Sequence, residues 1–142
     1  LDLRPHPEGG YYVETWRGEG EPRGCGTAIY YLMTNDRWQR WHKVDAVEIW
    51  HVYAGAPVEL ELQPASTQGE AELGADGTSP RTRVVLSSRP EEMQQGARPQ
   101  AIVPKGAWQR ARSTGPWSLC GCTVTPAFEF STFEILDLDQ EP

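Results

Sequence analysis

The residues best suited to chemistry in this chain are His42, Glu48 and Gln109. A carboxylate that accepts a hydrogen bond from a histidine orients the imidazole and raises its basicity, as a general base near neutral pH requires. We therefore expect Glu48 to support His42 as the base. Gln109 can donate a hydrogen bond to a carbonyl oxygen that gains negative charge. These three side chains are the minimum set for removing a proton beside a carbonyl, as in epimerisation or tautomerisation.

The register of the strand around Glu48 decides which other side chains share its cavity. Successive side chains of a strand point to opposite faces, so an inward Glu48 brings Trp50 inward and sends His51 outward. We expect Trp50 and Tyr30 to form aromatic walls of a cavity that binds a small polar ligand. His51 is either a structural residue, covered by a dimer partner or the second sheet, or a further ligand contact.

Two other segments supply candidate ligand contacts. In His6-Pro-Glu-Gly-Gly10 the glycines permit a close backbone approach, so the segment is either a lid that offers Glu8 to the cavity or a simple turn before a strand. Trp108 is a candidate for recognition as well as for packing, and the same two interpretations apply to Phe128 and Phe130.

Alternation of apolar and polar residues predominates over helical periodicity along the chain. A hairpin turning at Asp45-Ala46 is predicted to join strands at 40–44 and 47–54, and Ala-Asp-Gly at 75–77 predicts a second hairpin. The other strands are expected at 10–17, 27–34, 58–62, 81–86, 100–103, 107–112, 117–125 and 132–136. Only 89–96 is expected to form a helical turn or two. These short strands indicate an all-β fold, an antiparallel barrel or double-sheet jelly roll, in a single domain spanning 1–142.

Composition restricts the partners. The net charge of −7 disfavours nucleic acid and anionic membrane, and no apolar run has the length needed to cross a bilayer. Three cysteines, an odd number, do not form a disulfide framework. Cys120 and Cys122 would share one strand face as buried, inert thiols, which suits a reducing, cytoplasmic setting. The pairs Arg81/Arg83 and Arg110/Arg112 are expected to be solvated or to hold a phosphate.

Several motifs together resemble the cupin superfamily, and more narrowly its cupin-5 branch. They are His6-Pro-Glu-Gly-Gly-Tyr-Tyr12, Ile29-Tyr-Tyr-Leu32, Trp41-His42, Glu48-Ile-Trp-His-Val-Tyr-Ala-Gly55, Val103-Pro-Lys-Gly-Ala-Trp-Gln109 and Gly121-Cys-Thr-Val-Thr-Pro-Ala-Phe-Glu-Phe130. The resemblance implies a jelly-roll barrel and a homodimer, and no established activity. The usual metal ligands of the superfamily are incomplete, because Val44 and Gln109 stand where histidines would be expected. We therefore expect no metal and no other cofactor.

Three classes of function remain open from the sequence. The leading interpretation is a homodimeric cupin that binds a small polar metabolite, sugar-like or containing a carbonyl, and isomerises it without a metal. The second is a non-catalytic ligand-binding or storage module. The third is a metal-dependent oxygenase or isomerase with a reduced ligand set, which the metal content of purified protein would reveal.

Overall fold

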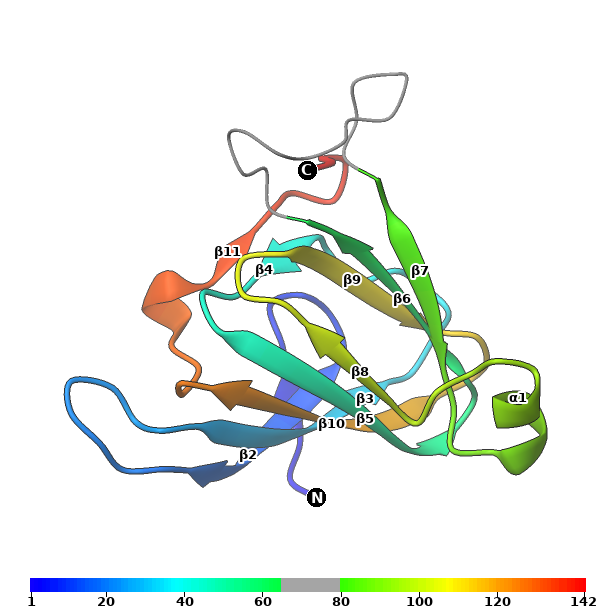
Figure 1. Cartoon of the computed structure of the whole chain (residues 1–142), viewed down its shortest axis with the longest axis horizontal. Coiled ribbons are helices and arrows are strands. Elements are labelled where there is room, and N and C mark those ends of the chain that lie inside the picture. The colour runs from blue at the N-terminus through cyan, green and yellow to red at the C-terminus, as the bar shows by residue number, and fades with distance from the viewer. Residues whose placement is uncertain (65–79) are drawn as a thin grey trace.

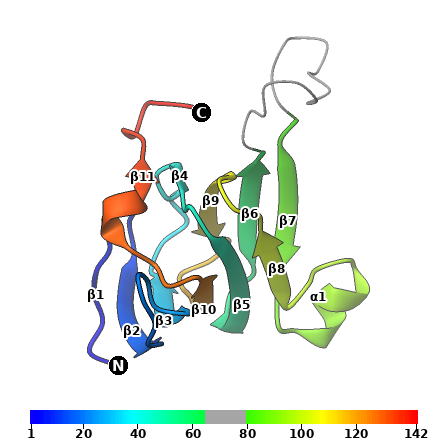
Figure 2. The same cartoon turned by 60° about the vertical axis from the view of Figure 1, so that its left-hand side comes forward.

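The structure is a computed structural model that describes residues 1–64 and 80–142 (Figure 1). It is nearly all β, as the sequence predicts, and its antiparallel strands form two facing sheets. The six-stranded sheet has the order β1 (Arg4–Pro5), β2 (Tyr11–Arg17), β3 (Thr27–Met33), β10 (Ser118–Thr125), β5 (Val47–Gly55) and β8 (Gln100–Val103). The five-stranded sheet has the order β11 (Glu134–Ile135), β4 (His42–Lys43), β9 (Trp108–Ser113), β6 (Val58–Gln63) and β7 (Thr82–Leu86). Figure 2 shows the sheets face to face.

The core forms where the inner faces of the sheets meet. β5 alternates between buried and more exposed residues, with Glu48, Trp50 and Val52 inside. β6 contributes Val58 and Leu60, both fully buried, from the opposite sheet. The predicted inward register of Glu48 and Trp50 is therefore confirmed. Burial of these apolar faces is the main force that holds the two layers together.

The predicted hairpin at Asp45-Ala46 is wrong. β4 pairs with β9 and β11 in the five-stranded sheet, whereas β5 pairs with β10 and β8 in the six-stranded sheet. The chain therefore crosses from one layer to the other at this turn. As a result, His42 and Glu48 approach each other across the barrel and not along one ladder.

Most other element predictions hold to within one or two residues. The helical turn is α1 (Pro90–Gln94), with Pro90 in its first turn. The strand predicted at 132–136 is shorter, because a 3₁₀ turn, η1 (Phe130–Thr132), precedes the two residues of β11. β1 was not predicted, and the hairpin signal at 75–77 lies outside the described residues. Among those residues, no helix has the length and hydropathy to cross a membrane.

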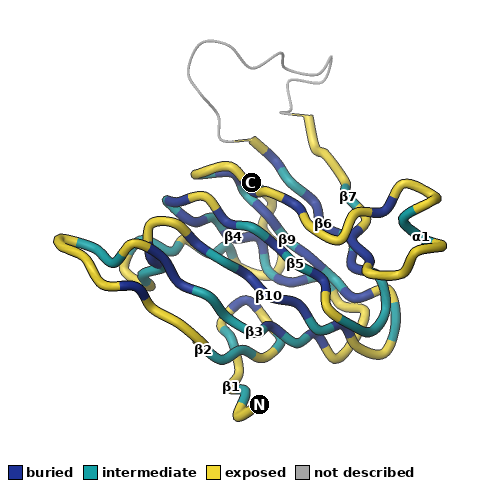
Figure 3. Tube along the Cα trace, turned by 60° about the horizontal axis from the view of Figure 1, so that its bottom comes forward, coloured by how far each residue is buried: buried dark blue, intermediate teal, exposed yellow. Residues whose placement is uncertain are grey.

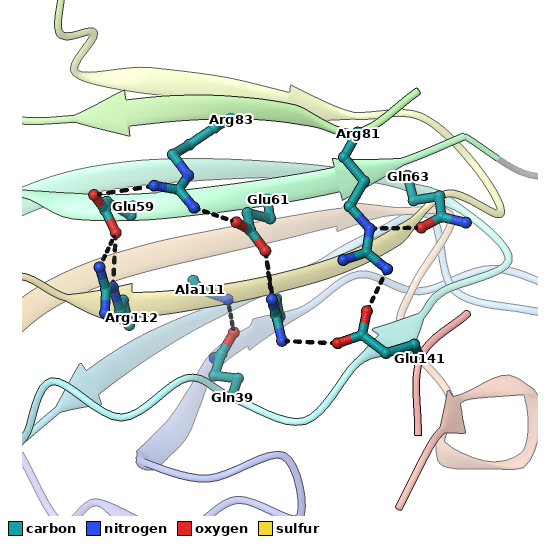
Figure 4. A network of polar contacts seen from close by, with 10 residues as sticks. Gln39, Glu59, Glu61, Gln63, Arg81, Arg83, Ala111, Arg112 and Glu141 are labelled. Carbon is teal, nitrogen blue, oxygen red and sulfur yellow. Dashed lines mark hydrogen bonds and ion pairs between the residues drawn. The ribbon is translucent and has the colours of Figure 1, made fainter. Parts of the chain in front are cut away.

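The outer face of the five-stranded sheet carries a network of ion pairs (Figure 4). Glu61 lies between Arg83 and Arg110, and Arg112 pairs with Glu59 at 2.6 Å. The guanidinium of Arg110 also lies over the rings of Trp38 and Trp41. Arg81 and Arg83 are exposed, as the expectation of a solvated surface requires, and the carboxylates that pair with these arginines take the place that a phosphate would occupy.

Candidate functional site

A cavity of about 430 Å³ opens between the two sheets. Its polar side chains include His6, Glu8, His42 and Glu48, and the lining also contains Asp2, Arg4, Glu14 and Thr27. The aromatic and aliphatic side chains of its wall are Tyr12, Val13, Ile29, Val44, Val124, Phe128, Phe130 and Phe133. The volume lies within the range of about 300–1,000 Å³ typical of small-molecule pockets. Its wall combines aromatic and aliphatic side chains with polar and charged ones.

His42 is paired with Glu8 and not with Glu48. Its Nδ1 lies 2.8 Å from the carbonyl oxygen of Arg40, and a carbonyl only accepts, so Nδ1 carries a proton. Its Nε2 lies 3.0 Å from Oε2 of Glu8. Burial alone would lower the pKa of His42, but the charge and hydrogen bond of Glu8 outweigh it and raise that pKa. The imidazole therefore favours its doubly protonated form.

Glu8 is the anionic half of this pair. It is buried, and burial alone would raise its pKa. The opposing attraction of His42 and His6 is larger in sum and holds the pKa of Glu8 below its ordinary value. Glu8 and His42 are thus a carboxylate and an imidazolium near neutral pH.

Glu48 has the opposite character. Burial raises its pKa to about 7, and the negative charge of nearby Glu8 adds to the shift. His42 and hydrogen bonds from Gln109 and Cys122 act against the shift without cancelling it. Two buried carboxyl groups on one cavity therefore hold different protonation states, the arrangement that separates an acid role from a base role. Glu48 exchanges its proton near neutral pH.

Gln109 and Trp50 hold Glu48 from behind. Oε1 of Gln109 accepts a hydrogen bond of 2.9 Å from the indole Nε1 of Trp50, which can only donate. The amide Nε2 of Gln109 must then face Glu48, to which it donates. Both side chains are fully buried and neither lines the cavity. The expectation that Trp50 forms a wall of the cavity is wrong, and so is the expectation that Gln109 donates to a substrate carbonyl, because its amide N–H is directed at Glu48. Both residues position Glu48.

The segment His6–Gly10 places Glu8 in the cavity. The backbone N–H of Arg40 donates to the carbonyl of Glu8 at 3.1 Å, and Nε2 of Gln39 donates to its carboxylate at 3.0 Å. Gly10 has φ of +70°, and a Cβ there would lie 2.7 Å from the carbonyl oxygen of Leu32. Only glycine fits this position without displacing the backbone. The segment is a turn that forms part of the cavity wall, and it offers Glu8 to the cavity as one of the two sequence-based interpretations expected.

An aromatic wall covers the cavity on the C-terminal side. Phe128, Phe130 and Phe133 contact one another at ring-centroid distances of 4.9–6.1 Å. Asp45 anchors this segment, because it accepts a hydrogen bond of 3.0 Å from the hydroxyl of Thr132 and a bidentate pair from Arg23. The wall is thus fixed to the crossover between β4 and β5.

The structure places three other predicted ligand contacts away from the cavity. Tyr30 lies on the outer face of the six-stranded sheet, where its ring meets that of Tyr53, and its neighbour Tyr31 points inward. His51 shares that outer face, 3.4 Å from the hydroxyl of Thr123. Trp108 lies under Nζ of Lys43 at 4.9 Å. These three are not cavity residues.

The sequence reasoning missed other wall residues. His6 lies 3.7 Å from Oε2 of Glu8, and its pKa is lowered, chiefly by burial. Cys122 contacts Glu48 from β10, and burial raises the pKa of its thiol well above the usual value. His6 and Glu8 lie in a turn between β1 and β2, where strand alternation does not apply, so their spacing gave no signal that both face the cavity. Phe128 and Phe130 serve as both packing and wall.

The residues present do not fit the metal that many cupins hold. Val44 lines the cavity without a donor atom, and the amide oxygen of Gln109 is occupied by Trp50. Within residues 1–64 and 80–142, no three His, Cys, Asp or Glu side chains are grouped so that they could hold a metal ion. A protein metal site needs about three or more such ligands. No step of the chemistry below runs through a metal.

These two sheets and the cavity between them define a cupin barrel, and comparison with known proteins agrees. The profile of the family described as Cupin superfamily (DUF985), Cupin_5, matches residues 1–136. The chain therefore belongs to this family. No match was found among curated proteins.

Solved structures place the chain near proteins of known fold. A protein from Shewanella oneidensis shares 28% identity at a TM-score of 0.78, over 95% of this chain and 78% of the other. A hypothetical protein from Leishmania major shares 30% identity at a TM-score of 0.76, over 94% and 81%. A dTDP sugar isomerase from Desulfovibrio desulfuricans shares 13% identity at a TM-score of 0.63, over 97% and 82%. This last likeness concerns the fold alone.

Proposed function

We propose that this cupin is a metal-independent isomerase or epimerase that moves a proton beside the carbonyl group of a small, sugar-like metabolite. The observation that carries the proposal is the raised pKa of Glu48, about 7, on the wall of a cavity that also holds the imidazolium–carboxylate pair of His42 and Glu8. The fold likeness to a dTDP sugar isomerase does not identify the substrate. The argument rests on the side chains.

Glu48 is the base in this proposal. A general base is most effective when its pKa lies near the working pH. Glu48 meets this condition, whereas His42 already carries a proton on both ring nitrogens. The roles expected from the sequence are therefore exchanged between the two residues. Glu8, and not Glu48, is the carboxylate that supports the imidazole.

His42 is the acid. Its Nε2–H is directed at Glu8 in the resting cavity, and a substrate carbonyl oxygen beside it would receive a share of that hydrogen bond. Charge that develops on the oxygen is stabilised by a fixed donor in a site that excludes water. Glu8 stays ionised and keeps the ring in place.

The proton transfer has two balanced steps. Glu48 takes the proton from the carbon beside the carbonyl while His42 gives its Nε2 proton to the carbonyl oxygen, which leaves a neutral enediol or enol. To interconvert an aldose and a ketose, Glu48 then gives its proton to the former carbonyl carbon while His42 takes the hydroxyl proton from the neighbouring carbon, which becomes the new carbonyl. To invert the carbon, the enediol or enol first turns its opposite face to Glu48, which returns the proton to the original carbon while His42 recovers its own from the carbonyl oxygen.

The wall favours a ligand with a polar end and an apolar face. Phe128, Phe130, Phe133 and Tyr12 present aromatic rings to the cavity, and Glu8, His42 and Glu48 contribute polar groups to it. The C–H face of a sugar ring packs against aromatic rings, and its carbonyl or hydroxyl groups suit the polar end. The aromatic rings therefore support a substrate with a sugar-like C–H face.

The test is hydrogen exchange in heavy water. Purified protein is incubated with a panel of aldoses, ketoses, their phosphates and 2-oxo acids, and proton NMR follows the replacement of hydrogen by deuterium beside each carbonyl. Exchange reports the first proton transfer even when no net product forms. We expect catalysed exchange with at least one compound, reduced about 10²–10⁴-fold in Glu48→Gln.

The same panel decides the alternative of a non-catalytic binding module. A compound that raises the melting temperature of the protein, with no exchange above the uncatalysed rate, would contradict catalysis and favour binding alone. Exchange that survives unchanged in Glu48→Gln would remove Glu48 from the mechanism.

A further inference from the structure

The imidazole of His6 is a buried group that takes no part in the proposed proton transfer. Its side chain is 6% exposed and lines the cavity. The chain reaches the cavity directly after β1, whose two residues are exposed at the edge of the six-stranded sheet, as Figure 3 shows. The protonation and the direction of this ring decide what it can offer to a ligand.

One ring nitrogen of His6 is committed to the turn that contains it. The backbone N–H of Glu8 lies 3.2 Å from Nδ1 of His6 and can only donate, so Nδ1 is the acceptor and carries no proton. Burial, together with the charge of nearby His42, lowers the pKa of His6 against the opposing charge of Glu8. The ring is therefore neutral, with its proton on Nε2.

The other ring nitrogen is open to the cavity. Tyr12, Phe130 and Phe133 line the cavity and surround the imidazole, at ring-centroid distances of 4.7, 6.0 and 5.9 Å. Within the described part of the chain, Nε2 of His6 has no hydrogen-bond partner. The only fully enclosed side-chain nitrogen or oxygen there without a partner is Nε1 of Trp41. The Nε2–H of His6 is therefore accessible to a ligand in the cavity.

The turn fixes this donor in place. The N–H of His6 donates to the carbonyl of Gly10, and the N–H of Gly9 donates to the carbonyl of His6, both at 3.0 Å. The hydroxyl of Tyr31 donates to the carbonyl of Gly9. The ring of Tyr12 meets the imidazole edge to face. A donor that is fixed before the ligand arrives needs no reorganisation to act on it.

Two imidazoles of different charge meet at Glu8. Its Oε2 lies 3.0 Å from Nε2 of His42 and 3.7 Å from Nδ1 of His6. The ring of Phe133 contacts both imidazoles, with its centroid 5.7 Å from that of His42 and 5.9 Å from that of His6. This part of the cavity thus holds two N–H donors, one on an imidazolium and one on a neutral imidazole.

We propose that His6 binds the hydroxyl oxygen on the carbon beside the substrate carbonyl, which makes the site selective for α-hydroxy carbonyl compounds. The inference rests on the proposed function, in which His42 serves the carbonyl oxygen. The two oxygens of an α-hydroxy carbonyl compound are on adjacent carbons, so they match two neighbouring donors. A carbonyl compound without the hydroxyl would leave the Nε2–H of His6 without an acceptor, which weakens its binding.

This contact is consistent with the interconversion of an aldose and a ketose. A hydroxyl oxygen that accepts a hydrogen bond from His6 keeps its own proton free for transfer to His42. The Nε2–H of His6 then stabilises the charge that develops on this oxygen as the new carbonyl forms. His6 keeps its proton throughout, so the balance of the proton transfer is unchanged.

Binding of benzohydroxamate tests the proposal without any turnover. This compound has a carbonyl oxygen and a hydroxyl oxygen on adjacent atoms, and its phenyl ring can pack against the aromatic wall. Benzamide lacks the second oxygen and is the matched control ligand. By isothermal titration calorimetry with a chelator present, we expect wild-type protein to bind benzohydroxamate about tenfold or more tightly than benzamide.

Substitutions of His6 should change this preference. His6→Phe keeps a ring and removes the donor, so the ratio of the two affinities should fall to about one. His6→Gln places an amide N–H at about the reach of Nε2 and should keep part of the ratio. His51→Phe is the matched control, because it makes the same change on the outer face of the six-stranded sheet and should keep the full ratio.

The tautomer of His6 can be measured in wild-type protein, which decides the matter if His6→Phe does not fold. In protein labelled with ¹⁵N at histidine, long-range proton–nitrogen correlations distinguish a protonated from an unprotonated ring nitrogen. We expect the His6 ring, assigned by its loss in His6→Gln, to carry its proton on Nε2 alone near neutral pH.

Three outcomes overturn the proposal. They are a wild-type protein that does not prefer benzohydroxamate, a preference that His6→Phe retains as fully as His51→Phe does, and a His6 ring protonated at Nδ1 near neutral pH. The outcome also separates this proposal from the proposed function. A preference that depends on His6, in a protein that catalyses no exchange beside a carbonyl, would uphold the His6 donor and remove the catalysis. Catalysed exchange with a preference independent of His6 would remove the His6 donor alone.

Discussion

Two glutamates of this protein are equally buried and differ in character. Glu48 is 8% exposed inside the barrel, and Glu61 is 7% exposed on the outer face of the five-stranded sheet. For both, burial acts to raise the pKa. In Glu61 this is outweighed by hydrogen bonds from Arg83 and Arg110, which lower the pKa below its ordinary value. In Glu48 the net shift is upward, to about 7.

The difference shows that burial alone does not make a reactive carboxyl group. Figure 4 shows Glu61 between two guanidinium groups, which keep it ionised at neutral pH. Glu48 instead shares its cavity with the negative charge of Glu8, while the nearby imidazolium of His42 is paired with Glu8. One carboxylate stabilises the sheet, and the other is left free to exchange a proton.

The largest expected difference between the two glutamates is in catalysis, and replacing each by glutamine measures it. Glu48→Gln should reduce carbonyl-adjacent hydrogen exchange about 10²–10⁴-fold, because glutamine cannot accept the proton. Glu61→Gln should leave exchange unchanged, since Glu61 lies outside the cavity. Heavy-water NMR on both variants checks this. Equal losses in the two variants would contradict the assignment.

Glu48 and Glu61 should also make the stability of the folded protein depend on pH in opposite directions. With a folded pKa of about 7 and an ordinary value of 4.5, folded wild-type protein binds more protons than the unfolded chain between these values. Its stability should therefore fall as pH rises through that window, by about 3 kcal/mol in all. Glu48→Gln should lack this loss. Urea unfolding at a series of pH values measures the difference, and a wild-type curve parallel to that of Glu48→Gln would contradict it.

For Glu61 the sign is reversed. Its folded pKa is lowered, so it contributes stability that is present above 4.5 and is lost as pH falls through the folded value. Glu61→Gln should be less stable than wild type at neutral pH by about 1–3 kcal/mol, because two arginines lose their carboxylate. The deficit should shrink on acidification. A deficit that stays constant down to acid pH would exclude ionisation as its origin.

Removing the charge of Glu8 should shift the pH dependence of catalysis. In Glu8→Gln the pKa of Glu48 should fall, because the like charge beside it is gone, and the pKa of His42 should fall with the loss of its counter-ion. Both limbs of the pH–rate profile for exchange should move to lower pH. A profile unmoved from wild type would show that Glu8 does not act on Glu48.

The smallest effect on catalysis is expected from a substitution of Trp50, which lies behind the cavity wall. Trp50→Phe removes the indole donor to Gln109, so the amide is free to turn and no longer holds Glu48 in one orientation. We expect about a tenfold loss in rate with a destabilisation of about 1–2 kcal/mol. Double-mutant analysis with Gln109→Ala checks the coupling, since additive effects would show that the two residues do not act together.

The strand pattern could be predicted from the sequence where polar and apolar residues alternate. β5 alternates clearly, so the inward register of Glu48 and Trp50 follows from it. β3 reads Thr-Ala-Ile-Tyr-Tyr-Leu-Met and has apolar residues on both faces, so nothing local distinguishes Tyr30 from Tyr31. The inward tyrosine proved to be Tyr31.

The charge balance of the site depends on contacts that local patterns do not encode. Glu8 reaches His42 because the turn before β2 folds against Gln39 and Arg40, which are far away in sequence. The turn at Asp45 resembles a hairpin locally, but the chain crosses there between sheets. Alternation sends Trp50 inward without indicating whether it meets the cavity or packs beneath it.

A direct titration of the Glu48 carboxyl group tests the central claim. Protein labelled with ¹³C at the glutamate side-chain carboxyl is titrated by NMR, and the Glu48 signal is assigned by its loss in Glu48→Gln and its retention in Glu61→Gln. We predict one glutamate that titrates near pH 7, present in wild type and Glu61→Gln and absent in Glu48→Gln. A Glu48 signal that titrates at the ordinary value of 4.5 or below would contradict the account.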